Sequence, residues 1–113
     1  AKIISNGLSN SEREVNAVID NYCYLKARAL VGDLSGTPFL FAFEDAREAA
    51  ELTSAQNVVL EYLLTDMSAG NIGAAIGKKR QSITRSRIRI VRKIAYYWSP
   101  LFRHPQREDD RIE

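Results

Sequence analysis

The sequence feature that most constrains the fold is a set of isoleucines in the second half of the chain. Ile83, Ile90 and Ile94 lie within about forty degrees of one another on a helical wheel, which gives a helix there one apolar side. Pro100 limits that helix, because proline lacks the amide hydrogen that a helix interior needs. We therefore predict a long helix over residues Arg80–Trp98, with the isoleucines facing a hydrophobic core.

The other side of this predicted helix is polar and strongly basic. From Lys78 to Lys93 there are eight Lys or Arg residues and no Asp or Glu, whereas residues 1–66 hold five basic side chains against ten acidic ones. The formal net charge of +2 therefore conceals a negative first half and a positive second half. Concentrated positive charge is typical of a surface that binds a nucleic acid or an acidic membrane, and we favour a nucleic acid. Five side chains lie opposite the isoleucines: Gln81, Arg85, Ile88, Arg92 and Tyr96.

Two shorter helices are predicted just before the basic one. Thr53 and Gln56 have the spacing of a capping box, which predicts a helix over residues 54–66. Ser68 is a suitable N-cap for a short helix over residues 69–76. We expect three side chains of this short helix to face inward: Ile72, Ala75 and Ile76.

The first half of the chain has weaker signals. Ser11 and Glu14 have capping-box spacing, and apolar residues at helical spacing then predict a helix over residues 12–31. Residues 37–43 (TPFLFAF) are rich in aromatic side chains, and we expect a strap that packs over the helices rather than a patch that meets a partner. A short helix is expected over residues 44–51.

Together these elements predict an all-α fold in three parts. Residues 1–51 form an N-terminal helical arm with its connecting strap. Residues 52–98 form a three-helix domain, in which a short helix, a turn at Gly77 and a long basic helix have the order of a helix-turn-helix. Residues 99–113 are a charged tail.

Residues 52–94 carry motifs that are similar to the helix-turn-helix domain of LuxR-type regulators, a domain closely similar to sigma factor region 4. That family opens with Leu-Thr, continues with Val-Leu and a serine, has Glu-Ile-Ala-x-x-Leu in its second helix, and has Thr-Val and Lys-Leu in its third. The matching positions need no gap and are Leu52-Thr53, Val59-Leu60, Ser68, Asn71-Ile72-Gly73-Ala74-Ala75-Ile76, Ser82-Ile83 and Lys93-Ile94. The departures are Asp66 for a glycine, Asn71 for an acid, Gly73 for an alanine and Lys79 for a capping serine. Residues 1–51 leave no room for a phosphoreceiver or autoinducer domain, so the chain is more similar to small phage or mobile-element regulators.

Side-chain chemistry assigns two roles within this predicted interface. Arg or Lys can bond guanine bidentately, Gln can bond adenine, and Thr or Ile can touch a thymine methyl. The predicted base contacts are Arg80, Gln81, Thr84, Arg85 and Ile88. Phosphate contacts fix the register on the duplex and supply salt-dependent affinity. The predicted phosphate contacts are Thr53, Ser68, Lys78, Lys79, Ser82, Arg89 and Lys93.

The expected function is that of a cytoplasmic transcription regulator that binds double-stranded DNA as a homodimer. Its interface would be the helix over residues 12–31, which we favour, or the aromatic end at 96–102. One alternative is an adaptor that binds RNA polymerase as sigma region 4 does; another is a viral DNA-packaging subunit. We expect no enzyme activity, no cofactor and no metal, because Cys23 and His104 are the only residues of their kinds. No stretch approaches the ~20 apolar residues of a membrane-spanning helix.

Overall fold

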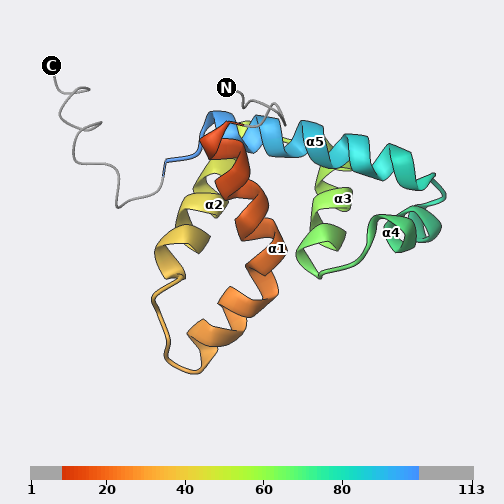
Figure 1. Cartoon of the computed structure of the whole chain (residues 1–113). Helices are drawn as coiled ribbons and strands as arrows, with labels where there is room; N and C mark the ends of the chain where they lie inside the picture. Colours follow the sequence, from red (N-terminus) through yellow and green to blue (C-terminus); the bar gives the residue numbers. More distant parts are fainter. Residues whose placement is uncertain (1–8, 100–113) are drawn as a thin grey trace, which may run out of the picture.

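The computed structural model describes residues 9–99, and within this range the chain forms five α-helices and no strand (Figure 1). The prediction of an all-helical fold is therefore confirmed. The helices are α1 (Asn10–Leu30), α2 (Thr37–Ala50), α3 (Ser54–Leu64), α4 (Ala69–Ile76) and α5 (Arg80–Tyr96). The tail expected at residues 99–113, including His104, lies outside the described residues from residue 100 onward. None of the described helices is long and apolar enough to cross a membrane.

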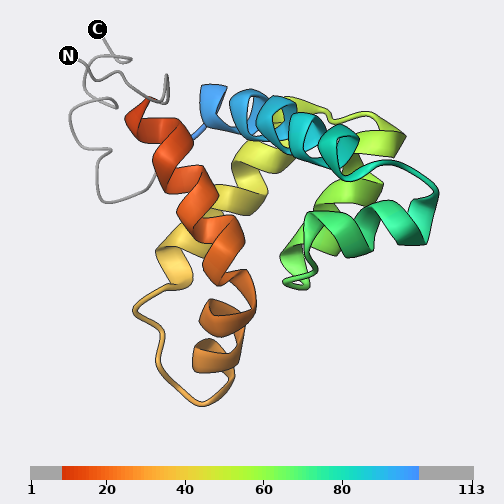
Figure 2. The same cartoon turned by 45° about the vertical axis from the view of Figure 1, so that its right-hand side comes forward.

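Helix α5 organises the fold, because it packs against each of the other four helices. It lies across one end of the molecule, and α1, α2 and α3 all lie on the same side of it (Figures 1 and 2). Helix α4 lies beside the N-terminal end of α5, whereas the hairpin of α1 and α2 turns at the end of the molecule far from α5. This arrangement leaves one side of α5 without a covering helix.

The hydrophobic core lies between α5 and the other helices. Phe43 of α2, Leu60 of α3 and Ile72 of α4 are fully buried there. The predicted core side of α5 is confirmed, since Ile83, Ile90 and Ile94 are also buried. Val15, Val18 and Ile19 of α1 belong to the same cluster, so the residues that we expected to form an arm share one core with residues 52–98. Each such buried aliphatic side chain contributes about 1.5–3 kcal/mol, which makes this shared core the main source of stability.

The start of α1 differs from the prediction. The capping box joins Ser9 and Glu12, not Ser11 and Glu14: the Glu12 amide donates to Ser9 Oγ at 3.1 Å, and the Ser9 amide donates to Glu12 Oε1 at 3.2 Å. The sequence contains both spacings, two residues apart. Glu14 accepts a hydrogen bond from Trp98 Nε1 at 2.7 Å instead, so tertiary packing selects the earlier box.

The prediction of a strap at residues 37–43 was wrong, because these residues are the first half of α2. Pro38 lies in the first turn, where a missing amide hydrogen costs no helical bond. Leu40, Phe43 and Ala46 then face the core at helical spacing, whereas Phe41 points outward and is 61% exposed. Aromatic density concealed this periodicity, because only one of the three phenylalanines is fully buried.

Smaller differences concern α4 and the ends of the last helices. Ala75 is exposed rather than inward, and Gly73 occupies a buried position in its place. Helix α3 ends at Leu64 and α5 at Tyr96, each two residues before the predicted end. Trp98 is nevertheless 5% exposed and belongs to the core.

Candidate nucleic-acid interface

The segment that leads from α4 into α5 is a tight turn with defined geometry. Ser68 caps α4 by accepting a hydrogen bond from the Asn71 amide at 3.2 Å. Gly77 ends α4 in the left-handed conformation (φ 75°), which costs glycine least. The Lys78 amide donates to the Gly73 carbonyl at 2.8 Å, and extended Lys79 then precedes the first residue of α5.

Gly73 has a structural role in this turn. A Cβ built on Gly73 would collide with the backbone carbonyl oxygen of Lys78 and would lie 3.3 Å from its carbon. The turn between α4 and α5 therefore lies directly against the α4 backbone. This close approach explains why position 73 holds a glycine.

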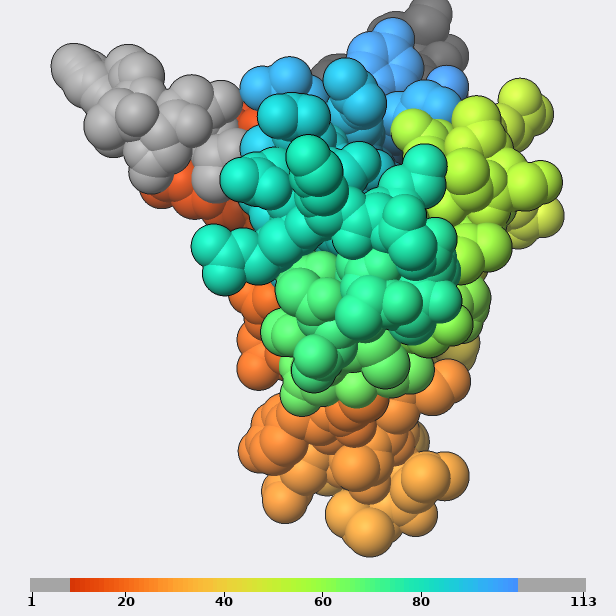
Figure 3. Space-filling model, turned by 90° about the vertical axis from the view of Figure 1, so that its right-hand side faces the viewer, coloured from red at the N-terminus to blue at the C-terminus, as the bar shows by residue number. Residues whose placement is uncertain are grey.

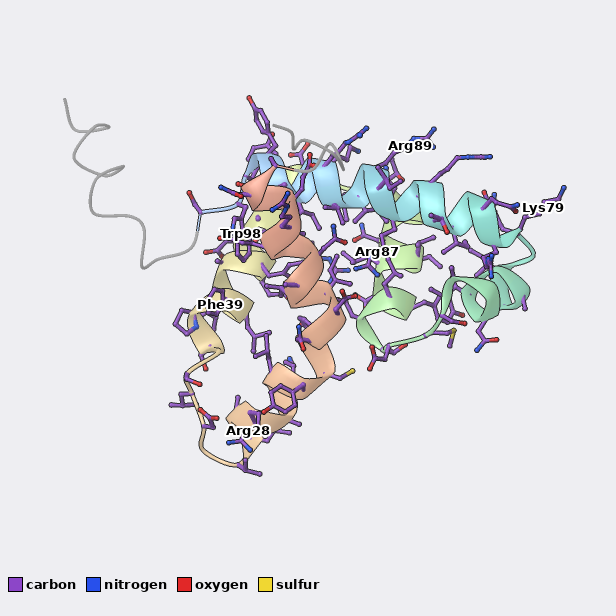
Figure 4. All side chains as sticks on the ribbon, viewed as in Figure 1. Arg28, Phe39, Lys79, Arg87, Arg89 and Trp98 are labelled. Atoms are coloured by element: carbon purple, nitrogen blue, oxygen red, sulfur yellow. The ribbon has the colours of Figure 1, made fainter. Side chains whose placement is uncertain are left out.

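The uncovered side of α5 carries the basic side chains. We define the basic face as Lys78, Lys79, Arg80, Gln81, Arg85, Ile88, Arg89 and Arg92, all of which are exposed. Arg80, the first residue of α5, lies at the α4 edge of this face, where its Cδ is 3.8 Å from the position of a Cβ on Gly70. Figure 4 shows Lys79 and Arg89 pointing away from the other helices. Lys78, Lys79, Gln81, Ser82 and Arg85 also line a shallow hollow of about 430 Å³ near the start of α5. Figure 3 views this end of the molecule, where α4 and the first turns of α5 form a continuous surface.

Among residues 9–99, the cations of the basic face have no acidic partners. The ion pairs of the described chain join Arg28 to Asp33, Arg47 to Glu61 and Arg87 to Asp20, and none involves the basic face. Six positive charges therefore gather on one surface without a described carboxylate to neutralise them, and they produce a strongly positive potential there.

Arg87 is the exception within α5, and sequence reasoning did not assign it a role. Its guanidinium donates to Asn16 Oδ1 at 2.9 and 3.0 Å and to Asp20 Oδ1 at 2.9 Å, so it joins α5 to α1. In Figure 4 it lies on the side of α5 opposite Arg89. The helical wheel contained this information, because Arg87 follows Ile83 by four residues and precedes Ile94 by seven, which places it at the edge of the core side.

The remaining predicted phosphate contacts lie at two further places. Thr53 Oγ1 caps α3 by accepting from the Gln56 amide at 3.1 Å, and Lys93 Nζ donates to Gln56 Oε1 at 3.0 Å, so Thr53 and Lys93 meet at the start of α3. Ser68 lies at the start of α4, where the Arg80 side chain passes 3.8 Å from the position of a Cβ on Gly70. Ser82 is half-buried. The predicted base contact Thr84 is exposed and donates its hydroxyl to the Arg80 carbonyl at 3.2 Å.

Comparison with known protein families, with curated proteins and with solved structures gives no match for this chain. Among residues 9–99, no three His, Cys, Asp or Glu side chains are grouped so that they could hold a metal ion. The candidate site therefore has to be argued from its own charge and shape.

Proposed function

We propose that this protein is a sequence-specific transcription regulator that binds double-stranded DNA through α4, the turn at Gly77 and α5, used as a helix-turn-helix. The observation that carries this proposal is the unpaired positive charge on the one uncovered side of a core-anchored helix. The major groove of B-DNA is ~12 Å wide and admits one α-helix. The major groove of A-form RNA is too narrow for side chains to contact, so duplex DNA fits this surface better than duplex RNA.

Because of its length, different parts of α5 are assigned different contacts with DNA. Its 17 residues span about 25 Å, twice the width of the groove, so only part of it can lie against base edges. Recognition helices usually contact bases near their N-terminal ends. We assign base contacts to the first turns: Arg80, Gln81, Thr84, Arg85 and Ile88.

Phosphates on either side of the groove are assigned to the cations and hydroxyls around this segment. Lys78 and Lys79 precede α5, and Arg89 lies one turn beyond Arg85. Thr53 and Lys93 form a second group at the start of α3, where the partial positive charge of the helix N-terminus favours a phosphate. Ser82 and Ser68 complete the assignment. A homodimer would double both sets of contacts.

Selection of bound sites from random duplex DNA at moderate salt tests the proposal, and we expect an enriched palindrome. Arg85→Ala should cost about 1–3 kcal/mol on the selected site and relax base preference at one position. Lys79→Ala is the matched control, because it should weaken all sequences alike and reduce the salt slope by about one unit. Unchanged binding by both variants would exclude α5 as the DNA-contacting helix.

A second candidate function is an adaptor for RNA polymerase, and exposed aromatic side chains favour it. Tyr96 is 82% exposed and packs edge-on against Tyr97, with ring centroids 5.0 Å apart. Exposed apolar side chains of this size often mark a protein partner. Capture of polymerase subunits at physiological salt, together with weak binding to every duplex, would select this function over the first.

A further inference from the structure

The hairpin of α1 and α2 ends in an apolar surface that the basic face does not use. We define the tip face as Tyr24, Ala27, Leu30, Val31 and Leu34, all of which are exposed. Four of the nine large hydrophobic side chains that are strongly exposed in the described chain belong to it, including Leu30 at 87% and Val31 at 76%. Figure 3 shows this hairpin end projecting beyond α3 and α4. Such a concentration of exposed apolar side chains indicates a partner surface.

The tip face is held in place by local hydrogen bonds. Asp33 accepts from Arg28 Nε at 3.0 Å, from the Ser35 amide at 3.1 Å and from Ser35 Oγ at 2.8 Å, while its own amide donates to the Arg28 carbonyl. These bonds fix the turn that carries Val31 and Leu34. A partner would therefore meet a surface that is already ordered, which lowers the entropic cost of binding.

The charges around the tip face are compatible with an identical surface. Arg28 and Asp33 form an ion pair at 2.9 Å, and Asp20, one turn before Tyr24, pairs with Arg87 at 2.9 Å. Lys26, beside Ala27 and Leu30, forms no ion pair within the described residues but lies over the Tyr22 ring, 5.6 Å from its centroid. With that exception, two copies of this face can meet without bringing unpaired like charges together, which a contact related by a two-fold axis requires. The basic face cannot meet itself in this way, because its six cations have no described partners.

We propose that the tip face is the surface through which two copies of this chain form a dimer, with their α1 helices side by side and parallel. The parallel arrangement, unlike the dimer itself, rests on the proposed function. Because α1 runs away from α5 toward the tip, a two-fold axis along α1 keeps both basic faces at the same end of the dimer (Figures 1 and 2). An antiparallel pair would turn them to opposite ends, where they could not bind one duplex.

The spacing of such a dimer is of the right order for DNA. Packed helix axes lie ~8–10 Å apart. Three such contacts join the two α5 helices: α5 to α1, α1 to its copy, and that copy to the second α5. The two α5 axes are therefore up to roughly 30 Å apart. Successive major grooves on one side of B-DNA are ~34–36 Å apart. The tip face can therefore join two basic faces that bind half-sites one helical turn apart.

The mass of the full chain in DNA-free solution tests the dimer, measured by sedimentation equilibrium from micromolar to submillimolar concentration. We expect twice the 12.7 kDa of one chain. Val31→Asp should raise the dimer dissociation constant about tenfold or more, whereas Val58→Asp, at another exposed valine on α3, should leave it unchanged. Both positions are on the surface, so folding should survive in both variants. A monomeric parent at every concentration would overturn the proposal, as would dissociation by Val58→Asp and not by Val31→Asp.

Disulfide cross-linking tests the orientation in a Cys23→Ser background. Val31→Cys should link to its own copy in the parallel dimer. A link that forms only when Val31→Cys is mixed with Tyr24→Cys would overturn the parallel arrangement. The two proposals can fail separately: a tip-face dimer that binds no duplex would remove the DNA-binding function alone, and a monomer that selects a single half-site would remove the dimer alone.

Discussion

The contact between Gly73 and the turn that follows α4 yields a prediction whose sign depends on the structure. Gly73→Ala should destabilise the protein, although alanine is the best helix former and glycine is poor in helices. The reason is the Lys78 backbone, which occupies the space that a methyl group would need. A backbone neighbour cannot yield by changing rotamer, so the whole turn would have to move.

The magnitude follows from two opposing effects. Replacing a helical glycine with alanine gains up to about 1 kcal/mol from helix propensity. Overpacking a buried site costs about 1–3 kcal/mol, and the upper half of that range applies here because moving the turn also strains the bond from the Lys78 amide to the Gly73 carbonyl. The net expectation is a loss of about 1–2 kcal/mol. That is a substantial share of the ~5–15 kcal/mol that stabilises a typical domain.

Gly70 provides the matched control in the same helix. The only heavy atom near a Cβ there is Arg80 Cδ at 3.8 Å, an ordinary contact. Gly70→Ala should therefore stabilise the protein by about 0.5–1 kcal/mol. Urea unfolding followed by the fluorescence of Trp98, the chain's one tryptophan, measures both changes. If Gly73→Ala proved as stable as Gly70→Ala, the close approach of the turn to α4, and the placement of Lys78 and Lys79 that depends on it, would be refuted.

Two further expectations concern the two sides of α5 and the packing of α1. Arg87→Met should lower the free energy of unfolding by about 1–2 kcal/mol, because it leaves Asn16 without its donor, and should keep the salt dependence of the proposed DNA binding. Arg89→Met should change the free energy of unfolding by less than about 0.5 kcal/mol and should weaken that salt dependence. Equal salt dependence in the two variants would contradict the assigned faces. Burial, aided by the hydrogen bond to Glu44, raises the pKa of Tyr22 from its ordinary value of 10.0 to about 12, so its stabilising effect is complete below pH 10.0 and is lost as the pH rises through about 12. The melting temperature of the parent should therefore fall more steeply across that interval than that of Tyr22→Phe, and parallel curves would show that the phenol is not held neutral in the fold.

The sequence was most informative where helix periodicity and local capping agree. Ile83, Ile90 and Ile94 are buried as their spacing predicts, and the capping box of Thr53 and Gln56 forms as expected. Each of these features depends on residues close together in the chain. Local chemistry is sufficient to determine them, so they could be predicted without knowledge of the fold.

The features that the sequence did not reveal depend on residues far apart. The capping box at Ser9 wins over the one at Ser11 because Glu14 is engaged by Trp98, 84 residues away. Helix α2 begins at Thr37 because α1 and α5 provide a core for Phe43. The charge pattern of α5 likewise did not distinguish Arg87 from its neighbours, since its partners Asn16 and Asp20 lie on another helix.

Arg87 also bears on what α1 contributes to the proposed helix-turn-helix. In the proposed function α5 must resist rotation about its own axis, because a turn of one residue, about 100°, would put Thr84 or Ser86 at the groove in place of Arg85. The isoleucines restrict the rotational position of α5 through apolar packing, which has no preferred direction. The three hydrogen bonds from Arg87 to Asn16 and Asp20 restrict the same position through directional bonds. If α1 also carries the dimer contact, the same helix fixes both the rotation of each basic face and the spacing between the two. A substitution at Asn16 would then disturb sequence preference without touching the DNA, an effect that neither the charge of α5 nor its helical pattern predicts.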